Sequence, residues 1–199
     1  MKKLIAFFLV FWCAGVVAET SRAHDGAWWI SVSADRRTGF LAGYIDCAEF
    51  ELGETQFAGV SWDAIEPEIT NYFNSQTQER GKAVTSELVR FVKKDKTGKN
   101  REGGEKYPEK HGIFDGEYWR QSTPDHRLGF LDGYKECQLK RGHPTAVSRH
   151  DSAWYASQIS LWYGVKADDP GEINARRSNR KIANVISQLE PKQPRSKKQ

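Results

Sequence analysis

The feature that most constrains this chain is an internal repeat, because residues 25–47 recur without a gap as residues 115–137. A segment that recurs at this length indicates two folded units of the same kind, each packing on its twin. Eleven of the 23 aligned positions are identical: Asp25 and Asp115, Gly26 and Gly116, Trp29 and Trp119, Asp35 and Asp125, Arg37 and Arg127, Gly39 and Gly129, Phe40 and Phe130, Leu41 and Leu131, Gly43 and Gly133, Tyr44 and Tyr134, Cys47 and Cys137.

Each copy carries the start signals of a helix. Ser33 and Thr123 are placed as N-caps, and Asp35 and Asp125 fall in the first turn, where a carboxylate meets the positive end of the helix dipole. Two more apolar patterns with helical spacing follow in each half, and no stretch alternates as a strand does. The sequence therefore predicts an all-α fold, a tandem duplication of a three-helix unit packed with pseudo-twofold symmetry. The further helical positions are Trp62, Ile65, Ile69, Tyr72 and Phe73, then Val84, Leu88, Phe91 and Val92, and in the second half Tyr155, Ile159, Trp162 and Tyr163, then Ile182, Val185, Ile186 and Leu189.

The repeated helices each hold two glycines four residues apart, Gly39 with Gly43 and Gly129 with Gly133. A glycine inside a helix costs about 1 kcal/mol relative to alanine, so a close approach by another backbone must compensate. One interpretation is that the two glycine helices cross each other near their cysteines. The other is that each glycine face receives a bulky aromatic side chain from its own half.

Composition shifts along the chain predict five segments. Residues 1–18 form a signal peptide, residues 19–92 the first helical repeat, and residues 93–110 a charged linker with almost no apolar residue. Residues 111–190 form the second repeat, and residues 191–199 a basic disordered tail.

The first eighteen residues predict export. Lys2 and Lys3 precede an apolar stretch, and small residues follow up to Ala18, where cleavage is expected. No other stretch approaches the roughly 20 apolar residues that a spanning helix needs. We therefore expect a periplasmic or secreted protein with no membrane span after cleavage.

Cleavage removes Cys13 and leaves one cysteine in each copy. An exported protein is exposed to an oxidising compartment, which favours a disulfide between Cys47 and Cys137. The alternative is that both are small buried residues that never meet.

The two ends of the chain carry more positive charge than the formal net charge of +4. Lys2 and Lys3 leave with the signal peptide, and the last eight residues hold four positive charges of their own. Because the remaining body is slightly acidic, we expect no nucleic-acid partner.

Two sets of repeated side chains are candidate binding residues. The aromatic pairs Trp28 with Trp29 and Tyr118 with Trp119 are suited to stacking on sugars or anchoring a protein. The alternative is that Asp25 and Asp115 cap a short helix whose tryptophans lock the glycine helix in place. The charged residues Asp35, Arg37, Asp125 and Arg127 are suited to binding a ligand, or they cap the helix dipole and tie a neighbouring loop.

The sequence predicts no catalytic residue, metal site or cofactor. Its five histidines lack metal-ligand spacing, no serine sits in a glycine-framed elbow, and no glycine-rich phosphate loop is present. An enzyme with an unrecognised site stays open as an alternative.

The segment 39–46 reads Gly, Phe, Leu, Ala, Gly, Tyr, Ile, Asp, and it resembles the glycine, tyrosine and aspartate helix of the Rap1a/Tai immunity proteins. The helices containing Ile69, Tyr72 and Phe73 and then Val84, Leu88 and Phe91 are similar to that family in their order. The resemblance implies a small exported helical protein that neutralises an effector, notably an amidase that cuts peptidoglycan. The chain departs from the family in carrying two units with one cysteine each.

These observations together predict an exported, non-catalytic helical protein that binds a protein partner in the cell envelope, of the kind that inhibits a cell-wall-acting enzyme. The first alternative is a protein that binds the cell wall, peptidoglycan or another glycan through its paired aromatics. The second is the enzyme with an unrecognised site.

Overall fold

The computed structural model describes residues 24–57, 60–94, 114–140, 149–165 and 175–190. In these residues the regular structure is helical, apart from an isolated β-bridge between Asp25 and Ala83, so the all-α prediction is confirmed. The predicted signal peptide, most of the predicted linker and the predicted disordered tail fall outside the described residues.

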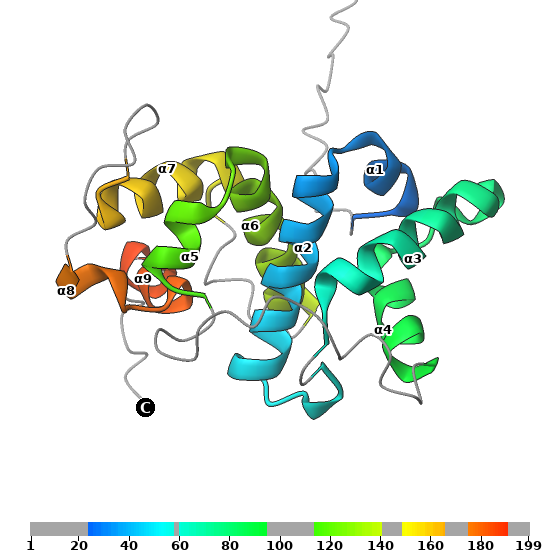
Figure 1. The fold of residues 1–199 in the computed structure, drawn as a ribbon, viewed down its shortest axis with the longest axis horizontal. Helices are drawn as coiled ribbons and strands as arrows, with labels where there is room; N and C mark the ends of the chain where they lie inside the picture. Colours follow the sequence, from blue (N-terminus) through cyan, green and yellow to red (C-terminus); the bar gives the residue numbers. More distant parts are fainter. Residues whose placement is uncertain (1–23, 58–59, 95–113, 141–148, 166–174, 191–199) are drawn as a thin grey trace, which may run out of the picture.

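The helices α2 and α6, one from each half of the chain, pack against each other at the centre of the molecule, and the other helices of each half lie on either side of this pair (Figure 1). The first half contains α1 (Gly26–Ser31), α2 (Ala34–Asp46), the π-helix η1 (Cys47–Glu51), the 3-10 helix η2 (Thr55–Phe57), α3 (Trp62–Ser75), the 3-10 helix η3 (Thr77–Glu79) and α4 (Val84–Lys94). The second half contains α5 (Gly116–Gln121), α6 (Pro124–Lys140), α7 (Ser152–Tyr163), α8 (Ala175–Ser178) and α9 (Ile182–Leu189).

Each half also has the short capped helix that the alternative interpretation of the aromatic pairs predicts, in addition to the three helices of the predicted unit. Asp25 caps α1 by accepting a hydrogen bond from the backbone amide of Trp28 at 2.9 Å, and Asp115 caps α5 through the amides of Glu117 and Tyr118. The unit is therefore the three predicted helices plus this short one. The helix α4 runs to Lys94, two residues past the predicted end of the first repeat.

The predicted starts of the glycine helices are confirmed. The Ser33 hydroxyl accepts a hydrogen bond from the amide of Arg36, and the Thr123 hydroxyl accepts one from the amide of His126 at 3.1 Å. From residue 31 to residue 40, every position has the same degree of exposure as its counterpart ninety residues later.

Hydrogen bonds recur between the halves at corresponding places. The indole of Trp29 donates to the hydroxyl of Thr70 at 2.8 Å, and the indole of Trp119, ninety residues on, donates to Ser160 at 3.0 Å. The amide of Val84 at the start of α4 bonds to the carbonyl of His24. The last helix repeats this bond with an offset of 98, between the amide of Ile182 and the carbonyl of Phe114. The second half therefore follows the first through all of its main helices, with eight extra residues before α9.

The two glycine helices contact each other backbone to backbone. A β-carbon added at Gly43 would overlap the carbonyl oxygen of Phe130, and one added at Gly133 would overlap the carbonyl oxygen of Phe40. The pair Gly39 and Gly129 meets the backbone of the opposite helix in the same reciprocal way. The close approach offsets the low helix propensity of glycine, and it leaves no room for a substrate between α2 and α6 at these positions.

A disulfide joins Cys47 to Cys137, with the two Cα atoms 6.2 Å apart, so the predicted pairing is confirmed. Both cysteines are buried in the core that the two halves share. The covalent bond therefore fixes the same junction that the glycines hold by packing.

Candidate protein-binding surface

The paired aromatics are mostly core residues. Trp29, Tyr118 and Trp119 are at most 2% exposed, and only Trp28 is half-buried. The indoles of Trp29 and Trp119 each use their N–H within their own half. Three of the four rings therefore have no face for a sugar, which corrects the interpretation that these pairs form a glycan platform.

The repeated carboxylates connect the ends of the two glycine helices. The Ser33 hydroxyl donates to Asp125 at 2.7 Å, and the Thr123 hydroxyl donates to Asp35 at 2.9 Å. Each cap residue thus accepts from its own helix and donates to the first turn of the other. This gives the two aspartates a structural role at an exposed edge of the crossing.

The repeated arginines point back toward the short helices. Arg37 bonds to Glu66 at 2.5 Å and to the carbonyl of Val32 at 2.7 Å. Arg127 bonds to the carbonyl of Trp119 at 2.8 Å, and burial lowers the pKa of its guanidinium. Neither arginine is paired with the aspartate two residues before it, so the structure does not bring together an Asp–Arg ligand pair on either helix.

One partly buried cluster has residue types that acid–base chemistry uses. Glu136 accepts hydrogen bonds from the amide and the ring of His24, each at 2.9 Å, and from the hydroxyl of Thr85 at 3.0 Å. Lys140 bonds to the same hydroxyl, and burial lowers the pKa of its amine. Thr85 is fully buried, so its hydroxyl cannot meet a substrate, and the cluster ties α6 to the first half.

No group of three or more potential metal ligands occurs among the described residues. Within that same part of the chain, no helix combines the length and the apolar content needed to cross a membrane.

The outer face of α7 differs from the other candidates because it is uncharged and includes an exposed leucine between two half-buried indoles that also pack against the core. We define the α7 face by six side chains of this helix, three exposed and three half-buried. No residue of α7 carries a charge, and Leu161 on this face is 65% exposed, the only large hydrophobic residue exposed among those described. The α7 face consists of Ala153, Trp154, Ser157, Gln158, Leu161 and Trp162.

The first repeat supplies a comparison surface on α3. The α3 face occupies the six positions ninety residues earlier, and each has the same degree of exposure as its counterpart on α7. It carries two carboxylates and one aromatic ring where the α7 face carries no charge and two indoles. The packing of the two helices is therefore shared, whereas their outward chemistry differs. The α3 face consists of Asp63, Ala64, Pro67, Glu68, Asn71 and Tyr72.

At each end of the α7 face, a histidine or arginine side chain packs against one of the two indoles. The His150 ring stacks on Trp154 with 3.8 Å between centroids. At the other end, the guanidinium carbons of Arg177 and Arg180 lie 5.3 and 5.8 Å from the centroid of Trp162. These contacts hold both indoles in place along the helix.

Sequence reasoning missed this surface because it assigned Trp162 to the buried side of the helix. Tyr155, Ile159 and Tyr163 are fully buried as predicted, but Trp162 is half-buried at the edge of that stripe. The available signal was the absence of any charge over the twelve residues of α7, which is unusual for a helix with a solvent-facing side.

Comparison with known proteins finds no matching family model, no matching curated protein and no matching solved structure.

Proposed function

We propose that this chain is an exported, non-catalytic protein that binds another protein of the cell envelope through the α7 face. The observation that carries the proposal is the difference between two equivalent helices. The buried sides of α3 and α7 share their packing, but their outward sides differ at every position. The α7 face has Trp154, Leu161 and Trp162 where the α3 face has Ala64, Asn71 and Tyr72, and it has lost both carboxylates of the α3 face. Exposed apolar surface that a fold does not require is typical of a binding site.

The composition of the α7 face favours a protein partner. Tryptophan and arginine are the residues most enriched among those that dominate the energy of protein interfaces, and both occur at its C-terminal end. Gln158 adds a hydrogen-bonding group between the two indoles. An apolar centre with polar and charged residues around it is the usual anatomy of such an interface.

Sugar binding by the same face has less support. Stacking on a sugar needs an open aromatic ring face. His150 already covers one face of Trp154, and two guanidinium groups lie close to the ring of Trp162. We therefore keep peptidoglycan binding as an outcome of the test.

The junction of the halves supports a binding role because it makes the surface rigid. The disulfide and the glycine crossing hold α6 against the first half. Asp132 of α6 accepts hydrogen bonds from the hydroxyl of Ser152, at the start of α7, at 2.5 Å and from Arg36 of α2 at 2.8 Å. These bonds tie α7 to the same junction. A surface that is already ordered loses less conformational entropy on binding, which favours affinity.

The immunity-like role belongs to the same proposal. The predicted N-terminal export signal and the resemblance of residues 39–46 to the Rap1a/Tai glycine helix support a wall-acting enzyme as the partner. Under this proposal the protein is an inhibitor that binds that enzyme in the periplasm and blocks or distorts its active site.

The test is a capture experiment with residues 19–199 as bait in solubilised cell envelope, run beside sedimentation with purified peptidoglycan. The control bait carries Trp154→Ala, Leu161→Asn and Trp162→Tyr, which gives α7 the residues of the α3 face at these positions. A stoichiometric protein captured by the natural bait and lost from the control supports the proposal. Equal capture by both baits, or sedimentation with peptidoglycan and no protein partner, contradicts it.

A further inference from the structure

The C-terminal end of the α7 face gathers positive charge. Arg177 and Arg180 are both exposed, both lie against the indole of Trp162, and Arg177 also donates to the carbonyl of Trp162 at 2.9 Å. The two guanidinium groups are thus held on one side chain at the edge of an uncharged surface. Arg149, also exposed, precedes the other end of α7.

The corresponding corner of the first half is neutralised. There Arg90 lies over Tyr72, the counterpart of Trp162, with 4.5 Å between the guanidinium carbon and the ring centroid. Arg90 also forms an ion pair with Glu87. Among the described residues, no carboxylate forms an ion pair with Arg177 or Arg180, whereas Arg90 at the corresponding corner has Glu87.

We propose that the protein that covers the α7 face presents carboxylate side chains to Arg177 and Arg180. This inference rests on the proposed function and names the chemistry of the partner. A guanidinium offers paired N–H donors in the geometry of a carboxylate, and an arginine held against an aromatic ring loses less freedom on forming that pair. The partner surface is then an apolar patch for Leu161 and Trp162 with acidic residues at one border.

Charge complementarity of this kind predicts a specific dependence on salt. Charges at the border of an interface mainly govern the rate of association and its sensitivity to ionic strength, because salt screens them over about 8 to 10 Å. The apolar centre does not depend on salt in that way. The two contributions can therefore be separated in one binding experiment.

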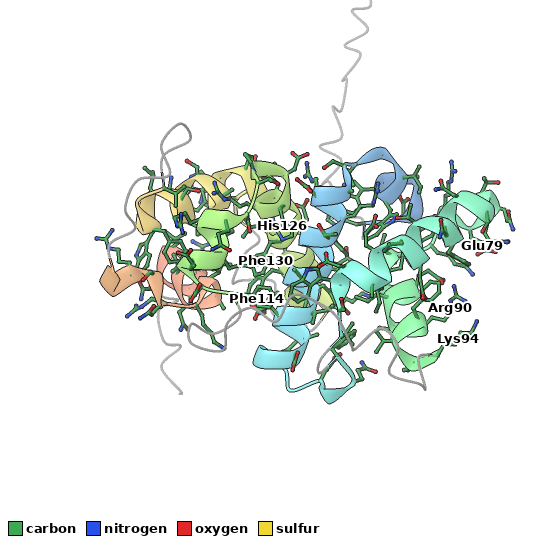
Figure 2. The ribbon with its side chains drawn as sticks, in the orientation of Figure 1. Glu79, Arg90, Lys94, Phe114, His126 and Phe130 are labelled. Carbon is green, nitrogen blue, oxygen red and sulfur yellow. A yellow bond between two sulfur atoms is a disulfide. The ribbon has the colours of Figure 1, made fainter. Side chains whose placement is uncertain are left out.

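The experiment compares baits in the envelope capture at 50, 150 and 500 mM NaCl, with poly-L-glutamate as an added acidic competitor. Arg177→Glu with Arg180→Glu reverses the charge of the corner, and Arg177→Lys with Arg180→Lys keeps it. The matched control is Lys93→Glu with Lys94→Glu on α4, which changes net charge equally at exposed positions; Figure 2 shows Lys94 at the end of the molecule opposite α7.

At 150 mM NaCl we expect the charge-reversed bait to retain at least about tenfold less partner than the natural bait, with the lysine and α4 variants close to natural. Poly-L-glutamate should compete for the natural bait and have no effect on the charge-reversed one, although both carry the same basic tail. Thermal unfolding of each bait checks that the fold is kept. If charge reversal lowers the midpoint, Arg177→Gln with Arg180→Gln replaces it.

Retention of the partner by the charge-reversed bait at natural levels, or an equal loss with the α4 variant, would overturn the inference. That result leaves the proposed function standing if the α3-like control bait still loses the partner. A failure of the proposed function looks different, because then the α3-like bait keeps whatever the natural bait captures.

Discussion

Leu161 occupies the place on α7 that Asn71 occupies on α3, and both side chains are exposed. The residues beneath them are equivalent and buried: Ile159 and Tyr163 lie under one helix as Ile69 and Phe73 lie under the other. The fold therefore tolerates a polar residue at this position. The proposed contact with a protein partner accounts for an exposed leucine next to the indole of Trp162 on an uncharged helix face.

Leu161→Asn should weaken partner binding by about tenfold to thirtyfold while leaving the fold unchanged. Removing a central apolar contact from an interface commonly costs about 2 kcal/mol of binding free energy. An exposed substitution that the first repeat already accommodates should shift the unfolding free energy by less than about 0.5 kcal/mol. Titration with the captured partner and thermal unfolding measure the two quantities, with Asn71→Leu as the control. Equal effects at both positions would argue against a role for α7.

Gly43→Ala should destabilise the protein strongly, although alanine is the better helix former by about 1 kcal/mol. Its β-carbon would overlap the carbonyl oxygen of Phe130, so α2 and α6 would have to separate. Because overpacking in a tight core costs about 1 to 3 kcal/mol, we expect a net loss of up to about 3 kcal/mol in urea unfolding. Gly81→Ala, where nothing lies within 4 Å of the added carbon, serves as the control. If the two variants unfold alike, the crossing is not under packing constraint.

Replacing Cys47 and Cys137 by alanine should lower the unfolding free energy. The bond closes a loop with a sequence separation of 90 residues. The chain-entropy model gives about 4 to 5 kcal/mol for a loop of this size, as an upper figure. Urea unfolding of the alanine variant, and of the natural protein in its oxidised and reduced states, measures the difference in unfolding free energy. The intact mass of the natural protein identifies the bond by a shift of about 2 Da on reduction. Identical unfolding curves in the two redox states would show that the bond adds nothing to stability.

Stability should fall as the pH drops below about 6.5, in part through His126. Its ring lies between the hydroxyl of Tyr118, 2.5 Å from Nε2, and that of Thr38, 3.2 Å from Nδ1. Burial lowers the pKa of His126 from its usual value of 6.5, with Asp35 partly opposing the shift. The unfolded chain then binds the proton more tightly than the folded one, so stability is present above 6.5 and is lost as the pH falls toward the folded pKa.

The measurement for His126 is urea unfolding at pH 7.5, 6.5, 5.5 and 5.0, beside the His126→Gln variant. The variant keeps a hydrogen-bonding side chain but cannot titrate in this range. We expect the stability difference between the two proteins to change between pH 6.5 and 5.0. A constant difference would mean that His126 does not contribute to the pH dependence.

The sequence predicted those parts of the fold that the two copies hold in common. The caps at Ser33 and Thr123 and the pairing of Cys47 with Cys137 all follow from positions that recur at an offset of ninety. Local signals such as an N-cap depend on neighbouring residues, so they can be read without knowing the tertiary structure. For the glycines, the sequence left two packing partners open, and only the structure identifies the opposite helix.

The candidate site could not be predicted from the repeat, because its residues differ between the two copies. Identity between copies marks the core, and it directed attention to Trp29 and Trp119, which are fully buried. The α7 face is defined by residues that differ between the copies, and its exposure depends on which side of α7 the rest of the half covers. Helical spacing alone groups Trp162 with Tyr155 and Ile159, because a half-buried position borders the buried stripe.

The most direct test of the α7 face is photo-cross-linking in living cells from a benzophenone amino acid placed at Leu161 and, in a matched strain, at Asn71. The account predicts a discrete protein adduct from position 161, absent from position 71, whose cross-linked peptide comes from one envelope protein. Adducts of equal yield from both positions, or none from position 161, would contradict the claim that this surface binds a protein partner.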